Sequence, residues 1–171
     1  MVMPKGTVVD LLRCDVRMPQ ERAALVEISD DGKIATFDPA KGFVDFPDGA
    51  KKFSVRFDPQ SNKSWTLGNT VAEKDLSNPP GAVRNTLALA SSPDLIHWQV
   101  YREVLHHEHP ENFGFQYADW QIGGDDIVAV CRTGFTDQTG AHNYHDANFI
   151  TFHRFENFRQ LASTNKAGGG R

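Results

Sequence analysis

The sequence predicts an all-β protein, and three observations support this prediction. Its apolar stretches are short, alternate with polar residues and are separated by turn residues. The 171 residues include 12 Phe, 3 Trp, 9 Pro and 14 Gly but few long helical patterns. A pattern of strands and turns also recurs along the chain. Together these features favour antiparallel sheets joined by tight turns.

Composition excludes several classes of protein. With 39% hydrophobic and 23% charged residues, the chain is typical of a soluble domain with one sizeable core. A net charge of −4 gives no indication of a nucleic-acid partner. No apolar run reaches the roughly 18 residues of a membrane helix, so we expect no membrane partner. The only two cysteines, Cys14 and Cys131, lack zinc-ligand spacing, and we expect no cofactor.

The first predicted strands lie within residues 7–40. Residues 8–14 and 24–28 alternate, and the turn 30–32 closes the second segment. A short helix over 20–28 is the alternative, but its β-branched end fits a strand equally well.

Two longer units follow. Residues 52–57 alternate at period 2, turn at 58–62 and continue at 64–67, with further strands at 86–89 and 97–102. The second unit comprises strands at 116–120, 127–130 and 149–152, with a turn at 123–126. We therefore expect four strands within 51–105 and three within 115–160.

The two units repeat at a fixed offset. Phe53 corresponds to Gln116 and Asn85 to Asn148, since 116 − 53 and 148 − 85 are both 63. Four antiparallel strands per period are typical of a β-propeller blade, although this period is longer than the common ones.

The predicted architecture is therefore a partial β-propeller over residues 1–162, with residues 163–171 as a disordered tail. The blade parts 7–40, 51–105 and 115–160 amount to about two and a half to three blades. Propellers close with at least about four blades, so we expect the chain to be part of a larger propeller. Open blade edges would favour self-association.

Three segments carry a family resemblance. Residues 92–98 resemble the Ser-x-Asp-Leu-x-x-Trp turn of glycosidase propellers and are close to the sialidase Asp-box (BNR) turn, one residue short and without its glycine. Residues 41–53 and 125–154 resemble a sialidase-like group of bacterial glycosidase propellers. This resemblance spans roughly residues 7–160 and implies the C-terminal half of a six-bladed propeller, secreted or periplasmic. The Arg-Ile-Pro segment and early acid/base Asp of sialidases are absent, and no Tyr–Glu nucleophile pair can be assigned.

Propeller connectivity predicts where a site lies. Loops joining second to third strands, and each blade to the next, open on one face. On that face we expect Arg132, Arg13 and Arg84 to bind the carboxylate of an acidic sugar, because guanidinium groups pair with carboxylates in bidentate fashion. The alternative is that these arginines form structural ion pairs.

The predicted catalytic residues are Asp119, His145 and Asp146. His145 is a candidate proton donor or base near neutral pH, and Asp146 could orient it or act as an acid. Asp119 lies on a predicted innermost strand, where carboxylates reach substrate; the alternative is a hydrogen-bond acceptor for the backbone of a neighbouring blade.

Tyr117, His142 and Tyr144 complete the predicted site as substrate-binding residues. Tyr144 could stack on a sugar or serve as the tyrosine nucleophile that sialidases use. A divalent ion held by His142, His145 and Asp146 is one alternative, and a loop whose side chains bond to local backbone is another. Asp94 is expected to staple a structural turn on the opposite face.

Three functions remain open on these residues. The first is part of a sialidase-like glycoside hydrolase acting on acidic glycans and inactive as an isolated chain. The second is a non-catalytic carbohydrate-binding propeller. The third is a polysaccharide lyase that uses His and Tyr as base and acid on a uronate. In each, the expected partner is a carbohydrate, and an acidic sugar above all.

Overall fold

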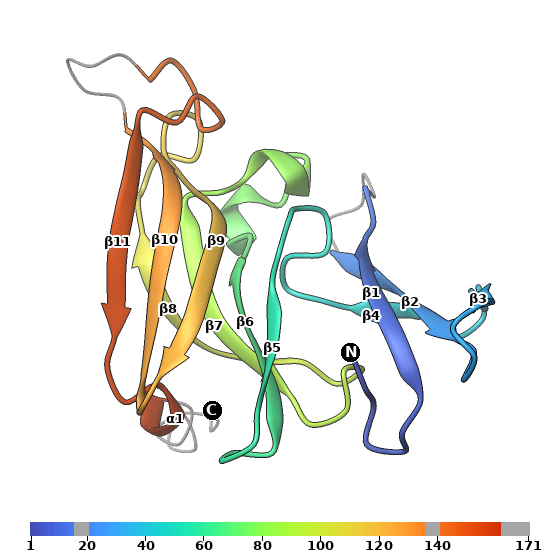
Figure 1. The fold of residues 1–171 in the computed structure, drawn as a ribbon. Helices are drawn as coiled ribbons and strands as arrows, with labels where there is room; N and C mark the ends of the chain where they lie inside the picture. The colour runs from blue at the N-terminus through green and yellow to red at the C-terminus, as the bar shows by residue number, and fades with distance from the viewer. Residues whose placement is uncertain (16–20, 136–140, 162–171) are drawn as a thin grey trace, which may run out of the picture.

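The structure, a computed structural model, describes residues 1–15, 21–135 and 141–161. It is all-β and consists of three antiparallel sheets that follow one another along the chain, which we call the N-terminal, central and C-terminal sheets (Figure 1). The predicted fold class is confirmed at this level. The predicted tail, 163–171, lies outside the described residues.

The N-terminal sheet is organised around its second strand. Its strands are β1 (Val8–Arg13), β2 (Arg22–Ile28), β3 (Ala35–Thr36) and β4 (Phe43–Asp45). Strand β2 pairs with β1 on one side and with β3 and β4 on the other. The alternative helix at 20–28 is wrong over the residues described, because alternating burial of Ala23 and Leu25 suits a strand with one covered face.

The central sheet is a four-stranded antiparallel meander, as expected for 51–105. Its strands in order are β5 (Val55–Asp58), β6 (Lys63–Asn69), β7 (Thr86–Ser92) and β8 (Gln99–His106). Every residue of β7 is buried, because the sheet is covered on both faces. Two 3₁₀ turns, Glu73–Asp75 and Pro80–Ala82, lie between β6 and β7.

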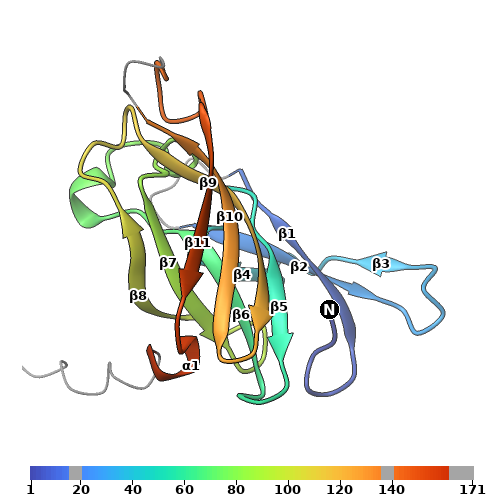
Figure 2. The same cartoon turned by 60° about the vertical axis from the view of Figure 1, so that its left-hand side comes forward.

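The C-terminal sheet contains the three strands expected within 115–160. They are β9 (Gly114–Gly123), β10 (Asp126–Gly134) and β11 (Phe149–Phe155), followed by the short helix α1 (Phe158–Leu161). Strand β10 is central, and β11 forms a free edge (Figures 1 and 2).

The predicted 63-residue repeat is confirmed in the second and third strands. Ser64 pairs with Ser92 in the central sheet and Ile127 with Phe155 in the C-terminal sheet; 127 − 64 and 155 − 92 are both 63.

The same offset is wrong for the first strands where they approach their hairpin turns. Arg56 pairs with Trp65, whereas the partner of Val128 is Gln121, and 121 − 56 is 65. The turn from β9 to β10 is two residues shorter than that from β5 to β6, which shifts the first strand by the same amount.

Two apolar cores separate the three sheets. The first lies between the central and C-terminal sheets and includes Trp65, Leu89, Trp120 and Phe158. The second lies between the N-terminal and central sheets and is centred on Phe46. The connections β4–β5, β6–β7 and β8–β9 lie at one edge of the stack, the upper edge in Figure 1, together with the end of β1, the start of β2, the end of β10 and the start of β11.

Candidate functional site

The candidate site at the upper edge is centred on Tyr117 in β9. This tyrosine has a φ of 49°, in the left-handed region that bulky residues rarely adopt, and it lies where the β9–β10 register shifts between Val130 and Arg132. The β-bulge re-aims the side chain relative to a regular strand. Strained backbone of this kind tends to occur at functional sites.

Three cationic side chains from different elements surround the Tyr117 ring. The Lys52 Nζ lies 5.0 Å from the ring centroid, and the Arg84 and Arg132 guanidinium carbons each lie 5.6 Å from it. None of the three forms an ion pair with a carboxylate among the described residues. No described carboxylate therefore lies within ion-pair distance of these three cations, although Glu21 and Asp48 attract Arg84, and Asp146 attracts Arg132, at longer range.

The Tyr117 hydroxyl forms a hydrogen bond with His145 Nε2 at 3.0 Å. Burial, together with the charges of Arg84 and Arg132, lowers the pKa of His145 below its ordinary value. The imidazole is consequently neutral at pH 7 and able to accept a proton. Arg132 Nη2 donates to the His145 carbonyl at 3.0 Å, which fixes the loop that carries the histidine.

We call Tyr117, Lys52, Arg84, Arg132 and His145 the Tyr117 cluster. Arg84 is its most buried cation. It is 7% exposed; its Nε donates to the Gly81 carbonyl at 3.0 Å, but its Nη1 is buried without a partner. Its guanidinium also lies 5.9 Å from the Tyr144 ring centroid. An unsatisfied buried donor costs about 1–3 kcal/mol, and Nη1 has no hydrogen-bond partner among the described residues.

A buried ionic group lies beneath the cluster, and sequence analysis missed it. Lys51 is fully buried and donates to Glu21 and to the Pro80 carbonyl, while its Nζ lies 3.5 Å from Asp48 Oδ1. Burial raises the pKa of Glu21 and raises that of Asp48 still further, although the Lys51 charge opposes both shifts. We name Lys51, Glu21 and Asp48 the Lys51 triad.

A close backbone contact places Lys51 at this depth. A Cβ at Gly49 would lie 2.1 Å from the Arg22 carbonyl oxygen, so the β4–β5 connection packs directly on β2. The short residues of 48–50 are the signal in the sequence, since they allow a connecting segment to approach another backbone closely.

Asp119 is held by a partner other than the cluster. Arg56 Nη2 donates to its Oδ1 at 3.0 Å and links β5 to β9. Asp119 is thus an acceptor between sheets, as in the alternative, but its partner is a side chain and not the backbone of the neighbouring sheet. The Asp119 carboxylate makes no contact with Tyr117 or His145 that would support the predicted catalytic role.

Asp146 and His142 bind each other. The Asp146 carboxylate accepts from the His142 backbone at 3.2 Å and contacts His142 Nδ1 at 2.9 Å, and these hydrogen bonds lower the pKa of Asp146. Within the described residues, no three His, Cys, Asp or Glu side chains gather as a metal site. His145 turns to Tyr117 instead of joining this pair.

Arg13 and Tyr144 have different environments. Arg13 ends β1, is exposed and belongs to the N-terminal sheet, outside the contacts that surround Tyr117. Tyr144 is half-buried beside Arg84, and its carbonyl accepts from the buried Gln116 side chain. A cavity of about 200 Å³ adjoins Tyr144 and is also lined by Asn78, Ala82, Val83, Pro110 and Glu111.

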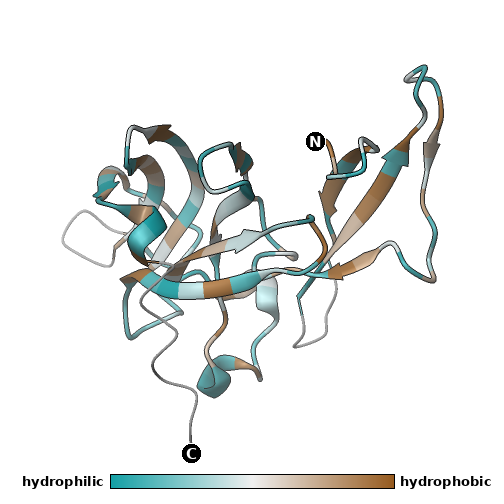
Figure 3. Ribbon diagram, turned by 90° about the horizontal axis from the view of Figure 1, so that it is seen from below, coloured by the Kyte–Doolittle hydropathy of each residue, from teal (hydrophilic) through white to brown (hydrophobic). Residues whose placement is uncertain are grey.

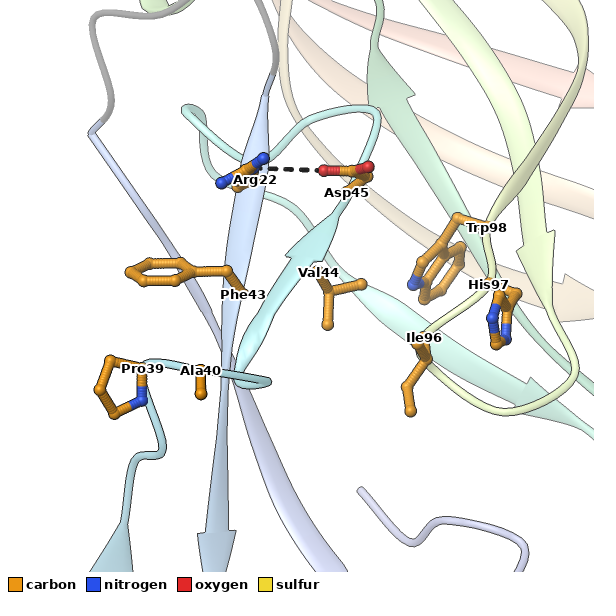
Figure 4. Close-up of a pocket in the computed structure, with 9 residues that line it drawn as sticks. All are labelled: Arg22, Pro39, Ala40, Phe43, Val44, Asp45, Ile96, His97 and Trp98. Atoms are coloured by element: carbon orange, nitrogen blue, oxygen red, sulfur yellow. Dashed lines mark hydrogen bonds and ion pairs between the residues drawn. The ribbon is translucent and has the colours of Figure 1, made fainter.

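A larger cavity, of about 610 Å³, lies between the N-terminal sheet and the β7–β8 turn (Figure 4). The charged groups drawn there, Arg22 and Asp45, bond to each other at 3.3 Å. With its charges already paired, this cavity offers less for an ionic ligand than the Tyr117 cluster.

The Asp94 turn lies at the opposite edge of the stack and is structural, as predicted. Asp94 Oδ1 accepts the backbone N–H groups of Ile96 at 2.9 Å and His97 at 2.8 Å, and Trp98 Nε1 donates to the Leu95 carbonyl at 3.0 Å. Although burial acts to raise the pKa of Asp94, the hydrogen bonds from His97, Ile96 and Ser92 hold it below its usual value.

No protein-family model matches the chain, and no curated protein matches it significantly. Within the described residues, no helix has the length and apolar character needed to span a membrane.

Proposed function

We propose that the chain is part of a β-propeller whose Tyr117 cluster binds the carboxylate of an acidic sugar and acts on a uronate-containing glycan by β-elimination. The observation that carries the proposal is the Tyr117–His145 hydrogen bond set among three cations without carboxylate partners in the described chain.

The sheet arrangement supports the propeller. Three antiparallel sheets stack face to face in chain order, and two of them share the register of their second and third strands. The first strands of these two sheets meet through Arg56 and Asp119. Neighbouring blades of a propeller bring their innermost strands together in this way.

The charges support an acidic sugar. Arg84 and Arg132 present guanidinium groups, which bind planar carboxylates through two parallel hydrogen bonds. Tyr144 and Tyr117 offer the aromatic faces on which sugar rings commonly stack. A carboxylate accepts stronger hydrogen bonds from these guanidinium groups than the neutral hydroxyls of a sugar do.

The residues present supply the proton transfers of an elimination. His145 Nε2 removes the proton from the ring carbon that bears the carboxylate, and that electron pair forms a carbon–carbon double bond to the adjacent carbon. The glycosidic C–O bond on that adjacent carbon breaks, and the Tyr117 hydroxyl gives its proton to the departing oxygen. The 3.0 Å contact then lets the His145 imidazolium return a proton to Tyr117.

A hydrolase of sialidase type is the second candidate. Most glycosidases need two carboxyl groups at the scissile bond, whereas sialidases use a tyrosine nucleophile. Tyr117, with cations on its ring, suits that nucleophile better than Tyr144 does. The described carboxylates near the site are already engaged: Asp119 by Arg56, Asp146 by His142, and Glu21 and Asp48 by Lys51. This favours elimination over hydrolysis.

Binding tests the site without requiring turnover. Calorimetry should compare glucuronate with its neutral methyl ester. Arg132→Gln should weaken the binding of glucuronate by about tenfold or more, since a hydrogen bond to a charged group is worth roughly 1.5–3 kcal/mol. The affinity for the ester should not change. Arg154→Gln, on the neighbouring β11, is the matched control and should bind like wild type. Equal losses for acid and ester would refute the proposal.

Product analysis separates the two reactions. Elimination gives an unsaturated uronate that absorbs in the ultraviolet, whereas the sialidase reaction releases free sialic acid from a sialylated oligosaccharide. The ultraviolet signal should appear on polyuronates and be lost in Tyr117→Phe and His145→Asn. Release of sialic acid without an ultraviolet signal would replace elimination by hydrolysis, and full activity of both variants would remove these residues from the mechanism.

A further inference from the structure

The outer face of the C-terminal sheet repeats an apolar face that is buried in the central sheet. Ile150 and Phe152 of β11 are 74% and 68% exposed. Their counterparts 63 residues earlier, Leu87 and Leu89, are 1% and 0% exposed, and 150 − 87 and 152 − 89 are both 63. The two leucines are buried because the C-terminal sheet packs on them.

A third position follows the same rule. Val130 pairs with Phe152 across the β10–β11 ladder and therefore lies on the same face, where it is exposed. Its counterpart, Leu67, is buried in the core between the central and C-terminal sheets. The bare face of the C-terminal sheet thus has the composition of a sheet-to-sheet interface, and large exposed apolar patches mark interaction sites.

At the other end of the stack, the outer face of the N-terminal sheet is also apolar and exposed. Val9 and Leu11 face the central sheet, so alternation turns Val8 and Leu12 to the opposite face, and both are exposed there. Phe43, also exposed, joins them through its pairing with Ala24, the partner of Leu12. Figure 3 shows apolar segments along the strands near the N-terminus.

We propose that two copies of this chain assemble head to tail, with the bare face of each C-terminal sheet packed on the bare N-terminal sheet of the other. This inference rests on the proposed propeller. The contact continues an interface that the chain already uses twice, between its first and second and its second and third sheets.

A second copy is the occupant that satisfies both bare faces at once. Twice three sheets gives six, within the four to eight blades of closed propellers. A two-fold axis then relates two identical contacts, and no sheet face stays exposed. The apolar residues at both ends would lie in cores like those that contain Leu89 and Leu11.

Sedimentation and light scattering test the assembly. The chain should be a dimer, and Ile150→Asp and Leu12→Asp should each be monomers, since either charge disrupts both symmetric contacts. Ile96→Asp, an exposed apolar residue in the β7–β8 turn, is the control and should stay dimeric. A monomeric wild-type chain, open-ended oligomers, or a dimeric Ile150→Asp variant would overturn the proposal.

Mixing the two monomeric variants tests the head-to-tail arrangement. In a mixed dimer both charges fall in one contact, and the other contact is intact. The mixture should therefore dimerise at concentrations where each variant alone is monomeric; failure to do so would overturn this arrangement.

Circular dichroism confirms that each variant is folded, with Ile150→Thr as the milder replacement if Ile150→Asp is not. Glucuronate binding by the monomeric Leu12→Asp variant reports on the Tyr117 cluster separately, whereas Ile150 pairs with Arg132 and a charge there would act on the site. Loss of dimerisation with intact sugar binding, or the reverse, tells which of the two proposals fails.

Discussion

Replacing Lys51 by methionine removes the only cation of the Lys51 triad while nearly preserving side-chain volume. The side chain is fully buried, and its ammonium group contacts Glu21, Asp48 and the Pro80 carbonyl. After the substitution, two buried carboxyl groups face each other without their lysine. Breaking a buried ion pair in this way costs about 3–5 kcal/mol.

Protonation of the carboxyl groups offsets part of this cost. Each pKa unit corresponds to about 1.4 kcal/mol, and the pKa values of Glu21 and Asp48 are already raised by burial. We therefore expect Lys51→Met to lower the free energy of unfolding by about 3 kcal/mol at pH 7.

The loss should depend on pH with a definite sign. Groups with raised pKa values bind more protons in the folded state, so their contribution to stability is present below the unfolded pKa of about 4 and is lost as pH rises. Without Lys51, the larger of the attractions that lower both pKa values disappears and only that of Arg84 remains, so this fall becomes steeper. The variant should lose more stability at pH 8 than at pH 5.

Urea denaturation followed by tryptophan fluorescence measures the effect at both pH values. The exposed Lys41→Met variant is the control and should stay within about 0.5 kcal/mol of wild type. Adding Glu21→Gln to Lys51→Met should recover part of the loss, because one buried carboxylate is removed. A loss below about 1 kcal/mol, or an equal loss at pH 5 and pH 8, would refute the reasoning.

Three further results are expected. Hydrogen bonds from Arg159 lower the pKa of Asp58, so this carboxylate stabilises the fold above its unfolded pKa and the effect is lost as pH falls; Asp58→Asn should flatten the acid limb of a plot of Tm against pH. Phe158→Ala should cost about 3–5 kcal/mol in urea denaturation, because the ring is fully buried between the sheets. Burial and neighbouring arginines hold the pKa of His145 low, so Arg132→Gln should raise it in an NMR titration; an unchanged value would contradict the charge contribution.

The sequence predicts the strands well because their signal is local. Short alternating segments and turn residues locate β1, β2 and the strands of the central and C-terminal sheets, whereas β4 lies outside the predicted range 7–40. The offset between Asn85 and Asn148 anticipates a register that pairing confirms. The first strands depart from that offset because turn length sets hairpin register. The turn between β9 and β10 consists of Gly124 and Asp125, whereas the turn between β5 and β6 is two residues longer.

The candidate site is predicted only in part because it depends on long-range contacts. Arg84, Arg132, Tyr117 and His145 do meet, as the connectivity argument implies. Asp119 does not, since its partner Arg56 comes from another sheet.

Two adjacent lysines differ in burial and in partners, and no local sequence pattern predicts this difference. Lys51 is buried in an ionic group, whereas Lys52 is exposed and covers the Tyr117 ring. The bulge at Tyr117 likewise comes from the pairing of β9 with β10, and no turn residue at that position predicts it from the sequence.

The shared register of β6–β7 and β10–β11 has a genetic consequence. An in-frame loss of residues 64–126 would join β5 and its turn directly to β10, whose pairing with β11 matches that of β6 with β7. Recombination between two such gene segments therefore removes or adds one whole sheet without creating a mismatched hairpin. This kind of repeat allows the number of sheets to change in single steps during evolution.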